Sequence, residues 1–158
     1  MSVPKKHIIG LISDTHGLLR NSAIEALAGS DHIIHAGDID TPEVLRELAA
    51  IAPVTAVRGN MDGPRRLGRL PETDIIELAG ILIYIIHDRM AMDIDPLAAG
   101  IFVVVSGHSH RPAIEKRNGV LCINPGSAGP RRFSLPISVG RLEIVNGRID
   151  PSIIELSE

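Results

Sequence analysis

The chain has 158 residues, of which 44% are hydrophobic and only 2% are aromatic. This length predicts a single domain spanning residues 1–158, with a core of Ile, Val, Leu and Ala. The formal net charge of −3 gives no electrostatic basis for a stable complex with nucleic acid. The single Cys122 excludes an internal disulfide, and no apolar run is as long as a membrane span. We therefore expect a cytoplasmic protein with no membrane partner.

Apolar, β-branched segments alternate with short amphipathic helices in the first part of the chain. The predicted strands are 8–12, 32–36 and 53–57, and helices are predicted near 21–28 and 42–51. This alternation is typical of an α/β fold that contains parallel strands.

In the remainder of the chain, turn signals join neighbouring β-type segments. Further strands are predicted at 74–78, 81–86, 101–106, 137–145 and 148–156. The pairs Asn118-Gly119 and Asn146-Gly147 predict tight hairpin turns. The whole pattern predicts an α/β fold with two packed mixed β-sheets flanked by helices.

Side chains able to bind metal ions follow the ends of several predicted strands. They are Asp14, His16, Asp38, Asn60, His87, His108 and His110. Ligands of open α/β sheets bind outside the carboxyl ends of the strands, so we expect these side chains to meet at one edge. Residues two apart on an extended chain project to the same side, so each of the two pairs, Asp14 with His16 and His108 with His110, is expected to face one crevice. Carboxylate and imidazole ligands without thiolate favour Mn, Fe, Zn, Co or Ni.

The order and spacing of these residues resemble the calcineurin-like metallophosphoesterase superfamily. Its pattern of DxH, GD, GN, a lone His and GHxH is matched within residues 8–127, which end in the NPGS segment 124–127. The chain is most similar in pattern to the compact single-domain phosphodiesterases of bacteria and archaea. This resemblance implies a four-layer αββα sandwich.

The resemblance also implies two divalent metal ions per chain, with Mn favoured and Ni, Fe, Zn or Co as alternatives. The implied ligands are Asp14, His16 and His110 for one ion and Asn60, His87 and His108 for the other, with Asp38 bridging the two. The reaction would be hydrolysis of a phosphate ester by a metal-activated hydroxide, with Asp14, Asp38, Asn60 and His87 as the catalytic set. The expected substrate is a small phosphodiester or a nucleotide-like ester.

Two positions depart from the family pattern. Many members read GNH, and their His is thought to stabilise the transition state or to protonate the leaving group. Met61 occupies that position here, and a thioether can do neither. We therefore favour a phosphodiesterase over a phosphomonoesterase. The lone His87 is followed by Asp88 where the family often has Gly, which alters the expected substrate entrance.

Other residues near these motifs are candidates for supporting roles. Asp62, His35 and Asp88 are predicted to orient the metal ligands through hydrogen bonds. For His35, a hydrogen-bonded position in the core is favoured over direct metal ligation. Asn60 and Arg131 are candidate contacts to the substrate phosphate.

Two other functional classes fit parts of the pattern. The superfamily includes the metallophosphoesterase-like subunit of the retromer coat, so a non-catalytic metal-binding interaction module is an alternative. The presence of all seven ligand-type side chains favours the enzyme. A metal-dependent amidohydrolase is excluded because its (β/α)₈ barrel needs about 200 residues or more. A homo-oligomer is compatible with either remaining function.

Overall fold

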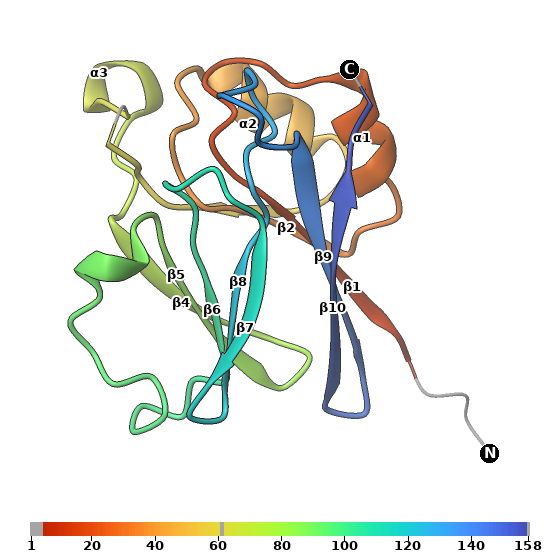
Figure 1. Cartoon of the computed structure of the whole chain (residues 1–158), viewed down its shortest axis with the longest axis vertical. Helices are drawn as coiled ribbons and strands as arrows, with labels where there is room; N and C mark the ends of the chain where they lie inside the picture. The colour runs from red at the N-terminus through yellow and green to blue at the C-terminus, as the bar shows by residue number, and fades with distance from the viewer. Residues whose placement is uncertain (1–4, 61, 158) are drawn as a thin grey trace.

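Two five-stranded mixed β-sheets pack face to face in the computed structural model, which describes residues 5–60 and 62–157 (Figure 1). Buried aliphatic side chains from both sheets meet between them, including Leu11 and Ile34 from the first sheet and Ile85 and Val105 from the second. The predicted pair of packed, mixed sheets is therefore confirmed, and so is its aliphatic core.

The first sheet combines three parallel strands with a C-terminal hairpin. Its strands are β1 (His7–Ile12), β2 (His32–His35), β3 (Val54–Ala56), β9 (Ser138–Val145) and β10 (Arg148–Glu155). Their order across the sheet is β10-β9-β1-β2-β3, and β9 runs antiparallel to β1. Because β1, β2 and β3 are parallel, the segments that follow them leave the sheet at the same edge.

The second sheet also has a parallel centre. Its strands are β4 (Thr73–Leu78), β5 (Ile81–Ile86), β6 (Val103–Val105), β7 (Ala113–Arg117) and β8 (Val120–Asn124). Their order is β4-β5-β6-β8-β7, with β5, β6 and β8 parallel to one another. The predicted hairpin turns join β7 to β8 and β9 to β10, where Asn118 and Asn146 each have a φ of 51°.

The helices lie mainly against one sheet. They are α1 (Asn21–Leu27), α2 (Pro42–Ala49), α3 (Pro64–Leu67) and the one-turn 3₁₀ helix η1 (Arg89–Ala91). Leu27 of α1 and Leu48 of α2 pack with Ile33 on the outer face of the first sheet. None of the described helices combines the length and the apolar character needed to cross a membrane.

The outer face of the second sheet is covered in a different way. Residues 88–102 cross it, and within them the described helical structure is limited to η1. Ile101 and Met92 of this segment pack against Tyr84 and Val104 of the sheet. A Pro at position 96 and a Gly at position 100 disfavour a longer helix there. The layer outside the second sheet is therefore mostly loop.

Candidate metal centre

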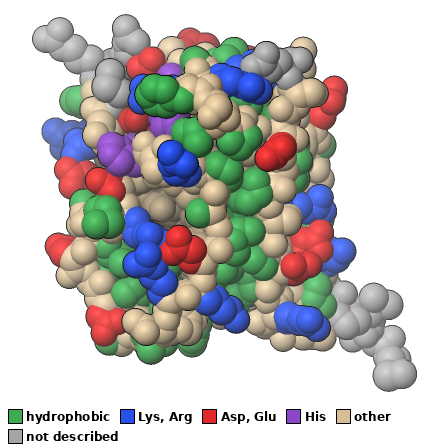
Figure 2. All heavy atoms as spheres, in the orientation of Figure 1, with side chains coloured by type: hydrophobic (Ala, Val, Ile, Leu, Met, Phe, Trp, Pro, Cys, Tyr) green, Lys and Arg blue, Asp and Glu red, His purple; other side chains and the backbone are tan. Residues whose placement is uncertain are grey.

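Strands from both sheets deliver potential metal ligands to one place. Asp14 follows β1, Asp38 follows β2 and His87 directly follows β5, while His110 comes from the segment after β6. Five of the seven predicted ligands form two groups, namely Asp14 with His16 and His110, and Asp14 with Asp38 and His87. The ligand atoms in each group lie within 4.8 Å of one another. Figure 2 shows histidine side chains (purple) at the surface, at the upper left of the face in view.

The spacing between these atoms suits a bound cation better than direct hydrogen bonds. Asp38 Oδ2 lies 3.3 Å from His87 Nε2 and 3.8 Å from His16 Nε2. Asp14 Oδ1 lies 3.5 Å from His110 Nε2. Charge-assisted hydrogen bonds are shorter, at about 2.7–2.9 Å. Ligands bonded at about 2.0–2.2 Å to one cation would lie about 3–3.5 Å apart, close to the observed separations.

Several of the buried ligand atoms lack hydrogen bonds. Asp14 Oδ1, His16 Nε2, His87 Nε2 and His110 Nδ1 have no hydrogen-bond partner among the residues that the structure describes. Buried polar atoms are nearly always satisfied, so four such atoms in one place require an explanation. Oxygen and imidazole nitrogen are the donors that Mn, Zn, Fe, Co and Ni accept. These residues therefore fit a divalent metal centre.

Two carboxylates lie between the histidines. Asp38 approaches both His16 and His87, as the predicted bridging role requires. Asp14 was assigned to one ion by resemblance, yet its Oδ1 lies 3.5 Å from His110 Nε2 and 3.8 Å from His87 Nε2. The bridging role of Asp38 stays a prediction, and the geometry adds Asp14 as a second carboxylate shared by both groups.

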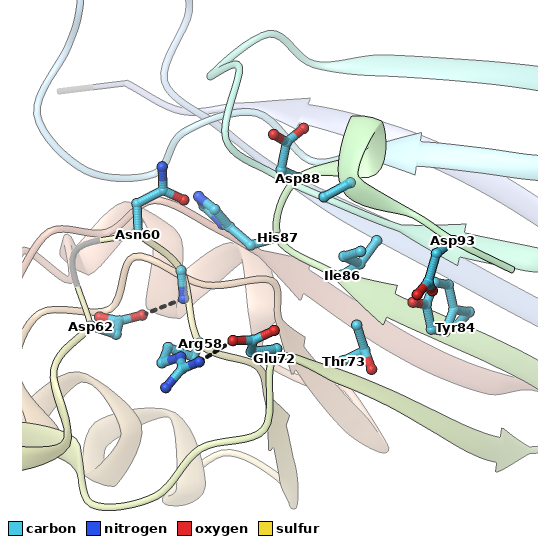
Figure 3. Close-up of a pocket in the computed structure, with 12 residues that line it drawn as sticks. Arg58, Asn60, Asp62, Glu72, Thr73, Tyr84, Ile86, His87, Asp88 and Asp93 are labelled. Atoms are coloured by element: carbon cyan, nitrogen blue, oxygen red, sulfur yellow. Dashed lines mark hydrogen bonds and ion pairs between the residues drawn. The ribbon is translucent and has the colours of Figure 1, made fainter.

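The other two predicted ligands lie at the rim. His108 belongs to neither group; its ring packs edge-on against His87 at 5.3 Å, and its side chain is 44% exposed. Its Nε2 lies 3.9 Å from Asp88 Oδ2. Asn60 is exposed and lines a cavity next to His87 (Figure 3). Both remain predicted ligands, placed beside the group that contains His87.

The backbone that carries the ligands is not extended. Asp14, His16, His108 and His110 have positive φ values of 54°, 47°, 73° and 63°. The extended backbone expected for the two pairs is therefore wrong, although Asp14 and His16 still belong to one ligand group. Left-handed backbone is costly for residues other than Gly and is concentrated at functional sites, so these segments are held by their surroundings.

Two glycines allow the ligand segments to approach one another. A Cβ atom at Gly59 would overlap the carboxylate and backbone N of Asp38. A Cβ atom at Gly107 would overlap the hydroxyl of Ser13 and come close to the carboxylate of Asp14. Only a residue without a side chain fits at these two positions.

Asp62 joins the segments that follow β2 and β3. Its Oδ1 accepts hydrogen bonds from the backbone N–H groups of Ile39 and Asp40, each at 2.9 Å. Its Oδ2 accepts one from the N–H of Gly59, also at 2.9 Å. These bonds hold the backbone beside Asp38, in keeping with the orienting role predicted for Asp62. The neighbouring Met61 lies outside the described residues.

His35 links β1 to β2 from within the core. The N–H of Gly37 donates to His35 Nδ1, so the proton of the neutral ring lies on Nε2 and is donated to Thr15 Oγ1 at 3.0 Å. The Thr15 hydroxyl donates in turn to the carbonyl of Ile39. Complete burial lowers the pKa of His35 to about 3. His35 therefore supports the segments that carry Asp14 and Asp38.

The buried His35 predicts a loss of stability in mild acid. Its pKa falls from 6.5 to about 3 on folding, so below pH 6.5 the unfolded chain binds a proton that the folded chain does not. We expect this residue to remove about 2 kcal/mol of unfolding free energy by pH 5. Urea unfolding at pH 7.5 and 5.0, with chelator present, should show a smaller pH dependence for His35→Gln than for the native chain. An equal pH dependence in the two proteins would contradict this assignment.

His87 has a fixed orientation. Its Nδ1–H donates to the carbonyl of Ala36 at 2.7 Å, which directs Nε2 toward Asp14 and Asp38. Burial lowers the pKa of His87, but the Asp38 carboxylate, the Ala36 carbonyl and the Asp14 carboxylate outweigh it and raise the pKa. Burial raises the pKa of Asp14 despite the hydrogen bond from Ser13. Asp14 and His87 therefore both hold a proton more readily than the free side chains do.

Several supporting residues were not identified from the sequence. The Ser13 hydroxyl donates to Asp14 Oδ2 at 2.8 Å, which leaves Oδ1 facing the histidines. Asn124 Nδ2 donates to the carbonyl of Gly107 and to Ser109 Oγ, supporting the segment with His108 and His110. A polar residue directly before the DxH motif was the available signal for Ser13. The contacts of Asn124 depend on the packing of β8 beside β6, which its sequence position does not reveal.

The remaining candidates lie around the centre. Asp88 accepts a hydrogen bond from the N–H of Met90 at the start of η1 and lies near His108. Arg131 is exposed and is not among the residues that line the cavity beside His87. Its neighbour Arg132 acts on the centre, because its charge contributes, after burial, to lowering the pKa of His110.

Comparison with known proteins gives a consistent result. The sequence profile of the calcineurin-like phosphoesterase superfamily domain matches residues 8–147. A probable metallophosphoesterase from Methanothermobacter thermautotrophicus is 36% identical over 160 residues, covering 93% of this chain and 91% of that protein. The structure of an archaeal phosphodiesterase has a TM-score of 0.78 at 25% identity, covering 93% of this chain and 99% of the other. Vacuolar protein sorting 29 from Cryptosporidium parvum shares the fold, with a TM-score of 0.76 at 20% identity and coverage of 97% and 99%.

Proposed function

The chain belongs to the calcineurin-like phosphoesterase superfamily, and from this premise we propose that it is a divalent-metal-dependent phosphodiesterase. The observation that supports this most directly is the convergence of Asp14, Asp38 and His87, together with buried ligand atoms that lack hydrogen bonds. The expected substrate is a small phosphodiester, in line with the name of the similar archaeal phosphodiesterase.

The residues of the chain would hold two cations and keep the site rigid. Asp14, His16 and His110 would hold one cation and Asn60, His87 and His108 the other, with Asp38 shared by both. When bound, two divalent cations supply a water of lowered pKa and neutralise charge on the phosphate oxygens. The chain contributes two negative carboxylates and imidazoles whose orientation is fixed, as by the hydrogen bond from His87 to Ala36.

Two features favour a diester over a monoester. Met61 stands where related proteins have a His that assists the leaving group, so the reaction depends on alcohols that leave without that help. Asp88 and Asp93 line the cavity beside the centre and disfavour the additional negative charge of a monoester dianion.

Removal and replacement of the metal tests the proposal. We expect a chelator to lower hydrolysis of bis(p-nitrophenyl) phosphate at least a hundredfold, and Mn to restore it. Zn, Ni, Co and Fe would be compared in the same assay. The diester should be hydrolysed at least tenfold faster than p-nitrophenyl phosphate.

Two outcomes would contradict the proposal. Absence of diester hydrolysis with every cation would exclude the activity. Tight metal binding without turnover of a broad panel of esters would instead favour a non-catalytic interaction module, for which the shared fold with vacuolar protein sorting 29 provides a precedent in shape.

A further inference from the structure

A cavity of about 610 Å³ opens beside the candidate metal centre (Figure 3). Asn60 and His87 line the end next to the centre, and Tyr84 and Asp93 line the far end. Small-molecule sites have volumes of roughly 300–1,000 Å³. The cavity is therefore large enough to hold one substituent of a phosphodiester whose phosphate lies at the centre.

The charged groups of the cavity leave it with an acidic character. Arg58 forms an ion pair with Glu72, so its charge is already compensated. The Asp62 carboxylate is occupied by backbone N–H groups. Asp88 and Asp93 also line the cavity. Its lining is therefore rich in hydrogen-bond acceptors and carries no uncompensated Lys or Arg among the described residues.

The hydroxyl of Tyr84 is a second feature of the cavity that points to a bound ligand. Its side chain is only 3% exposed, yet it lines the cavity, and Figure 3 places it beside Asp93. Its hydroxyl makes no hydrogen bond to any residue that the structure describes. The hydroxyl itself is not fully buried, so it is open to the cavity and can offer a donor and an acceptor to a bound molecule.

We propose that this cavity binds one alcohol substituent of the phosphodiester and selects a neutral, hydroxyl-bearing group of the ribosyl or glyceryl class. The inference rests on the proposed phosphodiesterase function. Hydroxyls of the substituent donate to the carboxylate of Asp93 and exchange hydrogen bonds with Tyr84 and Thr73. A second phosphate on the same substituent is disfavoured, because it meets the carboxylates of Asp88 and Asp93 while Arg58 is already paired.

Two esters that release the same p-nitrophenolate test the proposal. Thymidine 5′-(p-nitrophenyl phosphate) carries a neutral sugar, whereas bis(p-nitrophenyl) phosphate carries no hydroxyl. We expect Asp93→Asn and Tyr84→Phe each to lower the ratio of kcat/KM for the thymidine ester over the bis ester about tenfold. Asp95→Asn, in the same loop but outside the cavity, is the matched control and should leave this ratio unchanged.

Charged substituents supply the second part of the test. The thymidine ester with an added 3′-phosphate should be at least tenfold poorer than its parent in kcat/KM, and p-nitrophenyl phosphocholine should not exceed the parent. A preference for the choline ester, or for the added phosphate, would overturn the assignment.

The two proposals fail in different ways. A native chain that is inactive on the bis ester with every metal would overturn the proposed function itself. Suppose instead that the native chain hydrolyses the bis ester, and that both variants keep a ratio of kcat/KM for the two esters within twofold of the native ratio. That result would overturn only the role of the cavity. Asp93 is exposed, so Asp93→Asn tests that role even if Tyr84→Phe lowers stability.

Discussion

Replacement of Asp38 by Asn is expected to lower phosphodiesterase activity about a hundredfold or more. The Asp38 carboxylate approaches His16 on one side and His87 on the other. Asn keeps the shape of the side chain but removes its negative charge, and its NH₂ group cannot act as a metal ligand. One neutral oxygen cannot replace a charged carboxylate that is shared between two cations.

The measurement combines kcat for bis(p-nitrophenyl) phosphate with the metal content of the purified variant. We expect the metal content per chain to fall together with kcat, because loss of a shared ligand weakens both positions. Asp31→Asn is the matched control, since Asp31 lies just before β2, at the end of that strand opposite Asp38. A variant that retains two metals and activity within tenfold of the native chain would contradict a bridging role.

Ligands of open α/β sheets bind outside the carboxyl ends of the strands, and this explains why much of the site could be predicted from the sequence. Asp14, Asp38 and His87 were chosen because each follows an apolar, β-branched segment. The parallel strands β1 and β2 bring the first two to one edge, and the packing of the two sheets brings His87 of β5 beside them. The structure places these three together. For Asp14 and Asp38 that inference needed only the direction of the strands, which follows from the alternation of strands and helices.

The backbone geometry of the ligands was not accessible in the same way. Positive φ values at Asp14, His16 and His110 arise from contacts with other segments, such as the hydrogen bond from the His16 N–H to the Asp38 carbonyl. This conformation is uncommon for any residue other than Gly, and although His and Asp adopt it more often than most, the sequence does not mark which of them will. The local pattern therefore identified the ligand types but gave the wrong account of how they are aimed.

Contacts between residues distant in sequence account for the other differences. Asn124 supports the segment with His108 from a neighbouring strand, and no local pattern marks that contact. The cavity depends on residues 88–102 forming a loop over the second sheet. Prediction of its lining requires the path of this loop, and apolar periodicity does not determine that path.

Replacement of Asp62 by Ala is expected to lower the free energy of unfolding by about 3 kcal/mol or more. Asp62 is only 6% exposed, and its carboxylate accepts hydrogen bonds from the N–H groups of Ile39, Asp40 and Gly59. Hydrogen bonds to a charged group contribute about 1.5–3 kcal/mol each, and they are not additive. Ala would leave these N–H groups without an acceptor, two of them on the buried residues Ile39 and Gly59.

Urea unfolding of the metal-free protein measures this effect, with Asp74→Ala as the matched control because Asp74 accepts one hydrogen bond, from the adjacent Ile75 N–H. Metal titration provides the second readout. Because the Asp62 bonds hold the backbone next to Asp38 and Asn60, we expect metal affinity to fall about 10–100-fold, although Asp62 belongs to neither ligand group. A loss of stability with native metal affinity would show that Asp62 supports the fold but does not position Asp38. Native values of both quantities would contradict the role of Asp62 altogether.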